Sequence, residues 1–286
     1  MKFTTYLRNG QPRLGLLDGE SVIDVQDAQP QVPSDLRQAL LAGHDLTAVA
    51  KAALAAEAPR VPLASLRLAP LVPEPGKIIC LGLNYFDHAK ESGRQKPEYP
   101  WFFYRGASSL LAHGAPALKP RVSDKLDYEA ELAVVIGRRG KHVPQEKALE
   151  LVFGYACFND ISVRDYQKRT PQWTIGKNFD ATGGFGPVLV TADELPPGAE
   201  GLRIQGRLNG ETMQDANTRD MIWGVAETIA LLTECLTLEP GDVIVMGTPA
   251  GVGQSRTPPV WMKAGDVFEV EIDGLGTLKN TIVGEV

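Results

Sequence analysis

Short apolar runs that end at turn-forming dipeptides recur along most of this 286-residue chain. Runs of this length, bounded by glycine, asparagine or aspartate, are typical of strands joined by hairpins and loops. We predict strands over residues 77–83, 131–137, 186–190, 202–208, 243–246, 267–272 and 277–283. Asn209-Gly210, directly after one of these runs, is the strongest hairpin signal in the chain.

The first 70 residues show a different pattern. Asn9-Gly10 and Asp18-Gly19 each stand beside a short apolar run, which predicts small hairpins. An alanine- and leucine-rich segment, 36–56, predicts one or two helices. Prolines are dense between residues 70 and 76, and they disfavour both helix and central strand. We therefore predict a small N-terminal α+β domain at 1–70 and a larger domain at 71–286.

The larger region contains few helix candidates, of which 145–151 and 225–236 are the best. Strands do not alternate regularly with helices along the sequence, so a doubly wound parallel sheet is disfavoured. The pattern predicts an α+β fold in which strands dominate.

Charge and composition exclude several classes of protein. The formal net charge is −6, whereas a nucleic-acid-binding protein needs a basic surface, so we predict no nucleic-acid partner. No apolar stretch reaches the roughly 18 residues that cross a bilayer, and the N-terminus has no secretory signal pattern. Three widely spaced cysteines, Cys80, Cys157 and Cys235, form no metal-binding pair and are expected to be buried thiols. These features predict a cytoplasmic protein with no membrane partner.

Three acidic residues, Asp127, Glu129 and Glu131, stand at every second position just before an apolar run. Residues i and i+2 of a strand point to the same face, so Glu129 and Glu131 should converge. Two buried carboxylates repel each other unless a cation lies between them. Asp160, at the end of the apolar stretch 152–158, offers a third oxygen ligand. Three carboxylates without cysteine or clustered histidine predict a site for Mg²⁺ or Mn²⁺. Taken alone, the acidic triplet also fits a solvated strand end with alternating charges.

Other chemistry-bearing residues lie in the loops. His88 and Glu91 are three residues apart, so on a helix they would share a face, and a carboxylate beside an imidazole suits a general base. An exposed surface pair is the alternative. Lys177 could stabilise a developing oxyanion or could be a solvated loop lysine. The glycine-rich loop 247–253 could hold an anion through its backbone amides or could be a simple turn. The chain has no GxSxG and no HExxH motif, which leaves a serine or zinc hydrolase without support.

Taken together, these segments resemble the fumarylacetoacetate hydrolase family over roughly residues 70 to 286. The matching pieces, in order, are GLNYFDHAKE, DYEAELAVVIG, GYACFNDISVRDYQKR, GKNFDATGGFGP, LNGE, PGDVIVMGTPAGVG and GDVFEVEIDGLGTLKN. The resemblance implies a rolled mixed β-sheet around the active site, a variable N-terminal domain and a homodimer. It also implies roles for individual residues: Glu129, Glu131 and Asp160 as Mg²⁺ or Mn²⁺ ligands, His88 and Glu91 as a catalytic pair on a lid, catalytic Lys177, and substrate contacts from Gln167 and Thr248.

Two arginines near these motifs receive separate predictions. Arg164, within the matching SVRDYQ segment, is expected to pair structurally with Asp160 and Asp165. Arg105 could bind a second carboxylate of a substrate, although a surface arginine is the commoner case. The tail of a substrate would be read by the loops at 102–109 and 164–173.

The leading functional hypothesis is metal-dependent hydrolysis of a carbon–carbon bond in a small 2-oxo acid of the acylpyruvate or fumarylpyruvate type. His88, oriented by Glu91, would activate the attacking water, while Lys177 and the metal would stabilise a departing enolate. The alternatives that use the same metal are oxaloacetate decarboxylation, oxaloacetate tautomerisation and a hydroxymuconate-type isomerisation or decarboxylation. A non-catalytic metal-binding scaffold is the alternative of another class.

Overall fold

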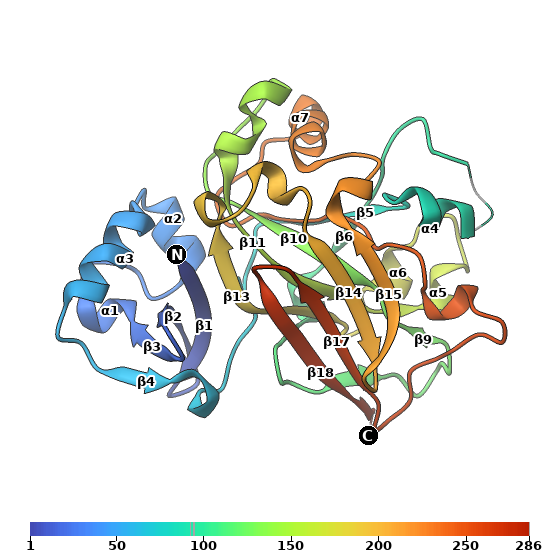
Figure 1. Ribbon diagram of the computed structural model, residues 1–286, viewed down its shortest axis with the longest axis horizontal. Coiled ribbons are helices and arrows are strands. Elements are labelled where there is room, and N and C mark those ends of the chain that lie inside the picture. Colours follow the sequence, from blue (N-terminus) through green and yellow to red (C-terminus); the bar gives the residue numbers. More distant parts are fainter. Residues whose placement is uncertain (92, 94, 286) are drawn as a thin grey trace.

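The structure is a computed structural model that describes residues 1–91, 93 and 95–285. A smaller N-terminal lobe lies beside a larger, strand-rich body (Figure 1). The N-terminal lobe comprises β1 (Lys2–Arg8), β2 (Gln11–Asp18), β3 (Ser21–Asp24), α1 (Val25–Ala28), α2 (Leu36–Leu41), α3 (Leu46–Ala55), β4 (Arg60–Pro62) and the 3₁₀ turn η1 (Leu63–Ser65).

Local sequence explains the elements of this lobe. Each α-helix begins at an aspartate whose side chain accepts hydrogen bonds from the first free backbone N–H groups. These N-cap residues are Asp24, Asp35 and Asp45. The predicted hairpin at Asn9-Gly10 is confirmed, because both residues have positive φ and join β1 to β2 with Arg8 opposite Gln11.

The larger body follows in a continuous series of short elements. They are β5 (Ile78–Gly82), α4 (Phe86–Glu91), β6 (Trp101–Arg105), η2 (Ala107–Ser109), β7 (Leu110–Ala112), β8 (Ala117–Lys119), β9 (Leu126–Asp127), β10 (Ala130–Ile136), η3 (Gln145–Leu151), β11 (Val152–Asp160), β12 (Ser162–Val163), α5 (Arg164–Gln167), α6 (Thr174–Lys177), β13 (Gly183–Thr191), η4 (Ala192–Glu194), η5 (Pro197–Ala199), β14 (Arg203–Leu208), β15 (Glu211–Asn217), η6 (Thr218–Asp220), α7 (Val225–Cys235), β16 (Val243–Val245), η7 (Gly253–Ser255), β17 (Val267–Ile272) and β18 (Gly276–Gly284).

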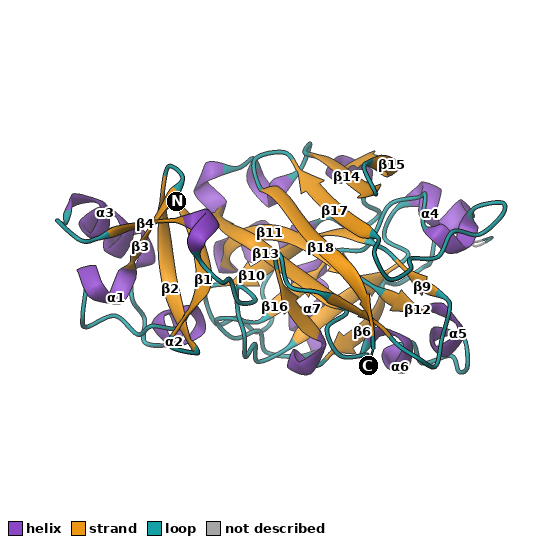
Figure 2. Ribbon diagram, turned by 90° about the horizontal axis from the view of Figure 1, so that it is seen from below, coloured by secondary structure: helices purple, strands orange, loops and turns teal. Residues whose placement is uncertain are grey.

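Most strands belong to one mixed sheet. In the described part of the chain this sheet has 11 strands in the order β4-β3-β2-β1-β13-β11-β10-β16-β5-β6, with β7 added parallel to β13. A second, five-stranded sheet has the order β15-β14-β17-β18-β8 and lies across the first (Figure 2). The β-dominated α+β fold predicted from the sequence is confirmed. The 145–151 segment differs from its prediction in type, because it forms the 3₁₀ helix η3 rather than an α-helix.

Both faces of the central strand β10 are buried. Leu132, Val134 and Ile136 face the hydrophobic core shared with the five-stranded sheet. Ala133 and Val135 face a second core that continues into the N-terminal lobe. Burial on both faces explains why this strand reads as a continuous apolar run rather than an alternating one.

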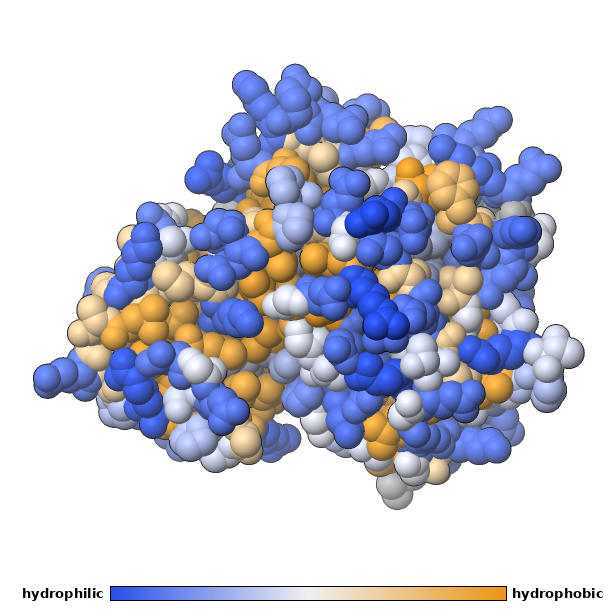
Figure 3. Space-filling model, in the orientation of Figure 1, coloured by the Kyte–Doolittle hydropathy of each residue, from blue (hydrophilic) through white to orange (hydrophobic). Residues whose placement is uncertain are grey.

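The N-terminal lobe is joined to the body through the main sheet. Strand β1 pairs antiparallel with β13, with Lys2 opposite Val190 and Phe3 opposite Leu189. Apolar residues also gather on the lobe and where it meets the body (Figure 3). The boundary placed near residue 70 stays a prediction, since the sheet itself runs across both parts.

No helix among the described residues has the length and apolar character needed to span a bilayer. Cys80 and Cys157 are buried as predicted, but Cys235 is exposed. It is the last residue of the amphipathic helix α7 and follows the exposed Glu234, so the expectation of burial was wrong for this residue.

Candidate active site

Three carboxylates meet where β10 and β11 pair. Glu131 lies in β10 opposite Phe158, and Glu129 lies just before β10, where its carbonyl accepts the Asp160 backbone N–H at 2.9 Å. The pairing of two strands therefore places Asp160 beside both glutamates. Ligand oxygens of Glu129, Glu131 and Asp160 all lie within 4.8 Å of one another, and all three residues are buried. The convergence predicted from the sequence is confirmed.

The charges around these acids differ between the two glutamates. Burial would raise the pKa of Glu129, but Arg164, Lys177 and His88 together hold it well below its usual range. Burial raises the pKa of Glu131, and the negative charges of Asp160 and Glu129 raise it further. The backbone N–H of Gly247 donates to Glu131 at 2.6 Å. Of the two glutamates, Glu131 is therefore the one with the greater need of an added cation.

The donor set fits a hard divalent cation. Three buried carboxylates from two paired strands supply oxygen ligands only, which suits Mg²⁺ or Mn²⁺ and leaves positions for substrate or water. The raised pKa of Glu131 is the physical sign that the cluster is electrostatically incomplete without such a cation.

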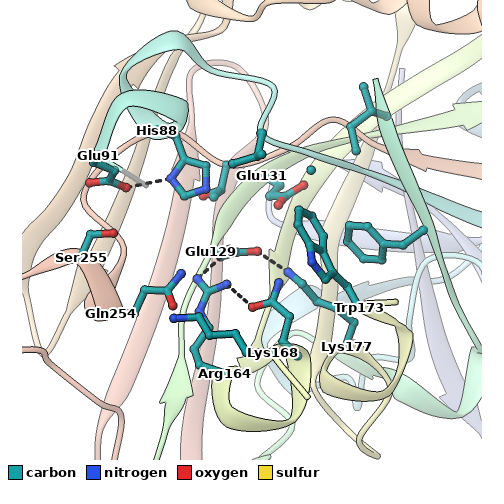
Figure 4. Close-up of a pocket in the computed structure, with 16 residues that line it drawn as sticks. His88, Glu91, Glu129, Glu131, Arg164, Lys168, Trp173, Lys177, Gln254 and Ser255 are labelled. Atoms are coloured by element: carbon teal, nitrogen blue, oxygen red, sulfur yellow. Dashed lines mark hydrogen bonds and ion pairs between the residues drawn. The ribbon is translucent and has the colours of Figure 1, made fainter. Parts of the chain in front are cut away.

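The predicted His–Glu pair is formed and faces this cluster. His88 and Glu91 lie on α4, and His88 Nδ1 is 2.8 Å from Glu91 Oε1. The other carboxylate oxygen of Glu91 accepts the Gly251 backbone N–H at 3.0 Å, so the glycine-rich loop fixes the glutamate. Because Nδ1 faces a carboxylate, the ring's Nε2 is left to face the pocket (Figure 4).

Lys177 is buried and lies against the carboxylates. It comes from the short helix α6, and its Nζ donates to Glu129 and, at 2.5 Å, to Asp160. Burial lowers the pKa of Lys177, but Asp160 and Glu129 raise it more, so the lysine stays charged. The structure thus excludes the alternative of a solvated loop lysine.

Arg105 differs from its prediction. Its guanidinium is buried, with Nε donating to Asp160 and one terminal nitrogen donating to the Ile161 carbonyl at 2.7 Å. It does not line the pocket that contains His88 and Glu129. Arg105 is therefore placed to hold Asp160 in position, whereas the sequence suggested a contact with substrate. The reason is that Arg105, the last residue of β6, points towards Asp160, the last residue of β11.

Replacing Arg105 with methionine tests this correction. Removal of one partner from a buried ion pair should lower the free energy of unfolding by about 3 kcal/mol or more. It should also weaken Mn²⁺ binding, because Asp160 loses the group that orients it. Denaturant unfolding and metal titration measure both effects. A variant with normal stability and metal affinity but a raised KM would instead support the substrate contact.

Gln167 and Thr248 line the pocket, as their predicted roles require. Thr248 Oγ1 donates to the Ala130 carbonyl at 3.0 Å and accepts from Gln214 Nε2 at 2.7 Å. Gln214, which sequence reasoning missed, is buried and also accepts the Ala130 backbone N–H at 2.9 Å. It therefore ties the start of β10 to the glycine-rich loop. Its position on a strand of the second sheet gave no local signal.

Arg164 pairs with acids, but not with the expected ones. Its guanidinium donates to Asp127 at 2.7 Å, to Glu129 at 2.6 Å and to Gln167 at 2.9 Å. Asp165 instead accepts from the Ser123 hydroxyl. Arg164 begins α5 at the end of β12, and that placement turns its side chain back over the start of β10.

Most of these side chains line one cavity of about 310 Å³, which suits a small organic acid, whereas Asp160, Arg105 and Gln214 lie behind its lining. His88 and Glu91 form one wall, the two glutamates lie at its base, and Trp173 and Lys177 stand opposite (Figure 4). The Trp173 ring lies so close to Gly82 that any added Cβ would meet it at 2.1 Å. Of the two segments expected to read a substrate tail, 164–173 lines the cavity with several residues, whereas 102–109 contributes Phe103, which lies in strand β6 rather than in a loop.

The model of the "Fumarylacetoacetate (FAA) hydrolase C-terminal" family matches residues 77–283. Oxaloacetate tautomerase YisK of Bacillus subtilis is 39% identical over 303 residues, covering 99% of this chain and all of that protein. The mitochondrial oxaloacetate tautomerase fahd2 of Xenopus laevis is 40% identical, covering 95% of this chain and 86% of that protein.

Solved structures resemble the chain over its full length. A fumarylacetoacetate hydrolase from psychrophilic Exiguobacterium antarcticum has a TM-score of 0.86 at 35% identity, with 100% of both chains covered. Maleylpyruvate hydrolase from Sphingobium sp. SYK-6, in complex with manganese(II) and pyruvate, has a TM-score of 0.84 at 29% identity, again with both chains fully covered.

Proposed function

Because this chain belongs to the fumarylacetoacetate hydrolase family and is a metal-dependent enzyme of it, we propose that it is an oxaloacetate tautomerase. The observation that carries the proposal is similarity to oxaloacetate tautomerases over nearly the whole of both chains. The geometry supports it, because the His88–Glu91 pair and two of the three clustered acids, Glu129 and Glu131, line one small cavity. This conclusion favours an alternative over the hydrolase that led the sequence-based hypotheses.

Keto–enol interconversion moves one proton between carbon 3 and the oxygen on carbon 2. It needs a base at the carbon and stabilisation of negative charge at the oxygen. A divalent cation held by Glu129, Glu131 and Asp160 would supply the Lewis-acid stabilisation of that oxygen. We propose Mg²⁺ or Mn²⁺ for this role, and the manganese in the related maleylpyruvate hydrolase supports the choice.

The proton is handled by residues of this chain. His88 Nε2 accepts the proton from carbon 3, while Glu91 stabilises the resulting imidazolium across its 2.8 Å contact with Nδ1. The proton then returns to the oxygen of carbon 2, which completes the exchange. Lys177, charged and buried beside Glu129, adds a fixed positive charge near the developing oxyanion. Gln167 and Thr248 would orient the substrate from the cavity wall.

Hydrolysis of an acylpyruvate is the second candidate. The full-length similarity to a maleylpyruvate hydrolase favours it, and the same His88–Glu91 pair could activate a water. The homodimer and the cytoplasmic location predicted from the sequence stay predictions.

An assay of the two substrates separates these functions. We expect the Mn²⁺-loaded protein to accelerate the loss of enol absorbance from freshly dissolved enol-oxaloacetate, and EDTA to abolish the acceleration. The same preparation should cleave acetylpyruvate and fumarylpyruvate at least about a hundredfold more slowly, since a change of substrate class removes several kcal/mol of transition-state binding. Rapid acylpyruvate cleavage with only the buffer rate of ketonisation would reverse the assignment.

A further inference from the structure

The cationic side chains that line the pocket differ in how far nearby carboxylates balance their charge. Arg164 directs its donors to Asp127, Glu129 and Gln167, so two carboxylates already balance its charge. Lys177 is likewise balanced by Glu129 and Asp160. Neither arginine nor lysine therefore has positive charge to spare for a second anionic group of a substrate.

Lys168 is different. It also lines the pocket, one residue beyond α5, but within the residues that the structure describes its ammonium makes no hydrogen bond and no ion pair. Lys168 is an exposed residue, and its charged neighbours are mainly positive. Burial lowers the pKa of Lys168, and Arg164 and Lys125 lower it further, whereas Asp127 raises it. An anion placed here would meet an unbalanced positive charge.

Two neutral polar side chains on the loop that follows the glycine-rich segment also lack hydrogen-bond partners among the described residues. The side chains of Gln254 and Ser255 line the same pocket, and neither has a hydrogen-bond partner among the described residues. Of the two polar atoms of the Gln254 amide, Oε1 is shielded from solvent, which leaves the nitrogen as the end that is open to a ligand. Both residues lie below Glu91, on the side of Arg164 away from Lys177 (Figure 4).

Asp127 holds these two walls together. Its carboxylate accepts the backbone N–H groups of Gly253 at 2.7 Å and Gln254 at 3.1 Å, and it accepts from Arg164 Nε at 2.7 Å. The loop that carries Gln254 and the helix that precedes Lys168 are thus fixed to one buried side chain. The backbone positions that carry the three side chains are therefore fixed before a ligand binds, so only the side chains need to be ordered.

We propose that Lys168, together with Gln254 and Ser255, forms a second anion subsite that binds the distal carboxylate of the substrate. The 2-oxo acid end lies at Glu129, Glu131 and Asp160, and the far carboxylate accepts hydrogen bonds from the ammonium, the hydroxyl and the amide nitrogen. The inference rests on the proposed function and deepens it, because the subsite selects dicarboxylic over monocarboxylic 2-oxo acids.

Oxaloacetate and pyruvate provide the test, since they differ only by the distal carboxylate. Trp173 lines the pocket, so binding of either acid to the Mg²⁺-loaded protein should quench tryptophan fluorescence. Stopped-flow mixing measures both affinities before oxaloacetate decarboxylates. One hydrogen-bonded charge pair should make wild-type binding of oxaloacetate about tenfold tighter than that of pyruvate. Lys168→Met should reduce this ratio to about twofold, with pyruvate affinity unchanged. Gln254→Leu should reduce the ratio by about threefold.

Lys125→Met is the matched control, because it removes the same charge from the neighbourhood of Lys168 but outside the pocket. It should leave the ratio at its wild-type value. An unchanged ratio in Lys168→Met, or an equal fall in both affinities, would overturn the subsite. The measurement does not need turnover, so a protein that discriminates through Lys168 but fails to tautomerise oxaloacetate would refute the proposed function and leave the subsite standing.

Discussion

Replacing Glu131 with glutamine should give a folded protein that has lost its response to metal and about a thousandfold of its activity. The amide is nearly isosteric with the carboxylate, so the packing around it is kept. It cannot supply the negative charge that balances a divalent cation beside Glu129 and Asp160. Mn²⁺ should raise the melting temperature of the wild type but not of the variant. Turnover of enol-oxaloacetate by the variant should be lower than that of the wild type by the factor given above.

The same variant should change how stability depends on pH. Burial first, and then Asp160 and Glu129, raise the pKa of Glu131 in the folded protein above that of the unfolded chain. The protonated carboxyl therefore adds stability that is complete below the ordinary carboxyl range and is lost as pH rises through the folded-state pKa. In EDTA, the wild type should lose stability relative to Glu131→Gln as pH increases. A constant difference across the pH range would contradict this account.

Replacing His88 with glutamine should remove most of the turnover while leaving metal binding intact. Loss of a general base costs about a hundredfold to ten-thousandfold in rate. The Mn²⁺-dependent rise in melting temperature should persist, since His88 is not among the clustered carboxylate ligands. Single-turnover ketonisation and thermal shift measure the two effects on one preparation.

Two further variants sharpen the His88 result. Glu91→Gln keeps a side chain beside Nδ1 but removes the charge that stabilises the imidazolium, so its rate should lie between those of the wild type and His88→Gln. His44→Gln, in the N-terminal lobe, should match the wild type. A His88→Gln protein with normal kcat would place the base elsewhere.

The parts of the site that could be predicted from the sequence were those set by local geometry. Two-residue alternation aligned Glu129 with Glu131, and the i,i+3 spacing aligned His88 with Glu91. Asp160 followed from its place at the end of a strand-like run. The Asn209-Gly210 turn joined β14 to β15 for the same reason, with both residues at positive φ.

The parts that could not be predicted depend on contacts between distant segments. Asp127 accepts a backbone N–H from Gly253, 126 residues further along the chain, and no local pattern indicates that pairing. Gln214 reaches Thr248 from another sheet. The direction of Arg105 depends on the position of Asp160 across the sheet, which is fixed only when β11 is in place. The alternation along a strand predicts which face of the sheet each side chain lies on, but it does not predict which residue that side chain contacts.

The pairing of β1 with β13 makes the N-terminal lobe an integral part of the protein rather than a removable attachment. Phe3 is completely buried and its ring lies 5.7 Å from that of Phe153, so the first strand fills part of the interior. Removal of the lobe would leave the backbone of β13 around Leu189 and Val190 unpaired. An exposed edge strand of this kind can form hydrogen bonds with the strands of other chains. Shortened versions intended to isolate the enzymatic portion should therefore self-associate, and engineering of this protein should retain the first strand.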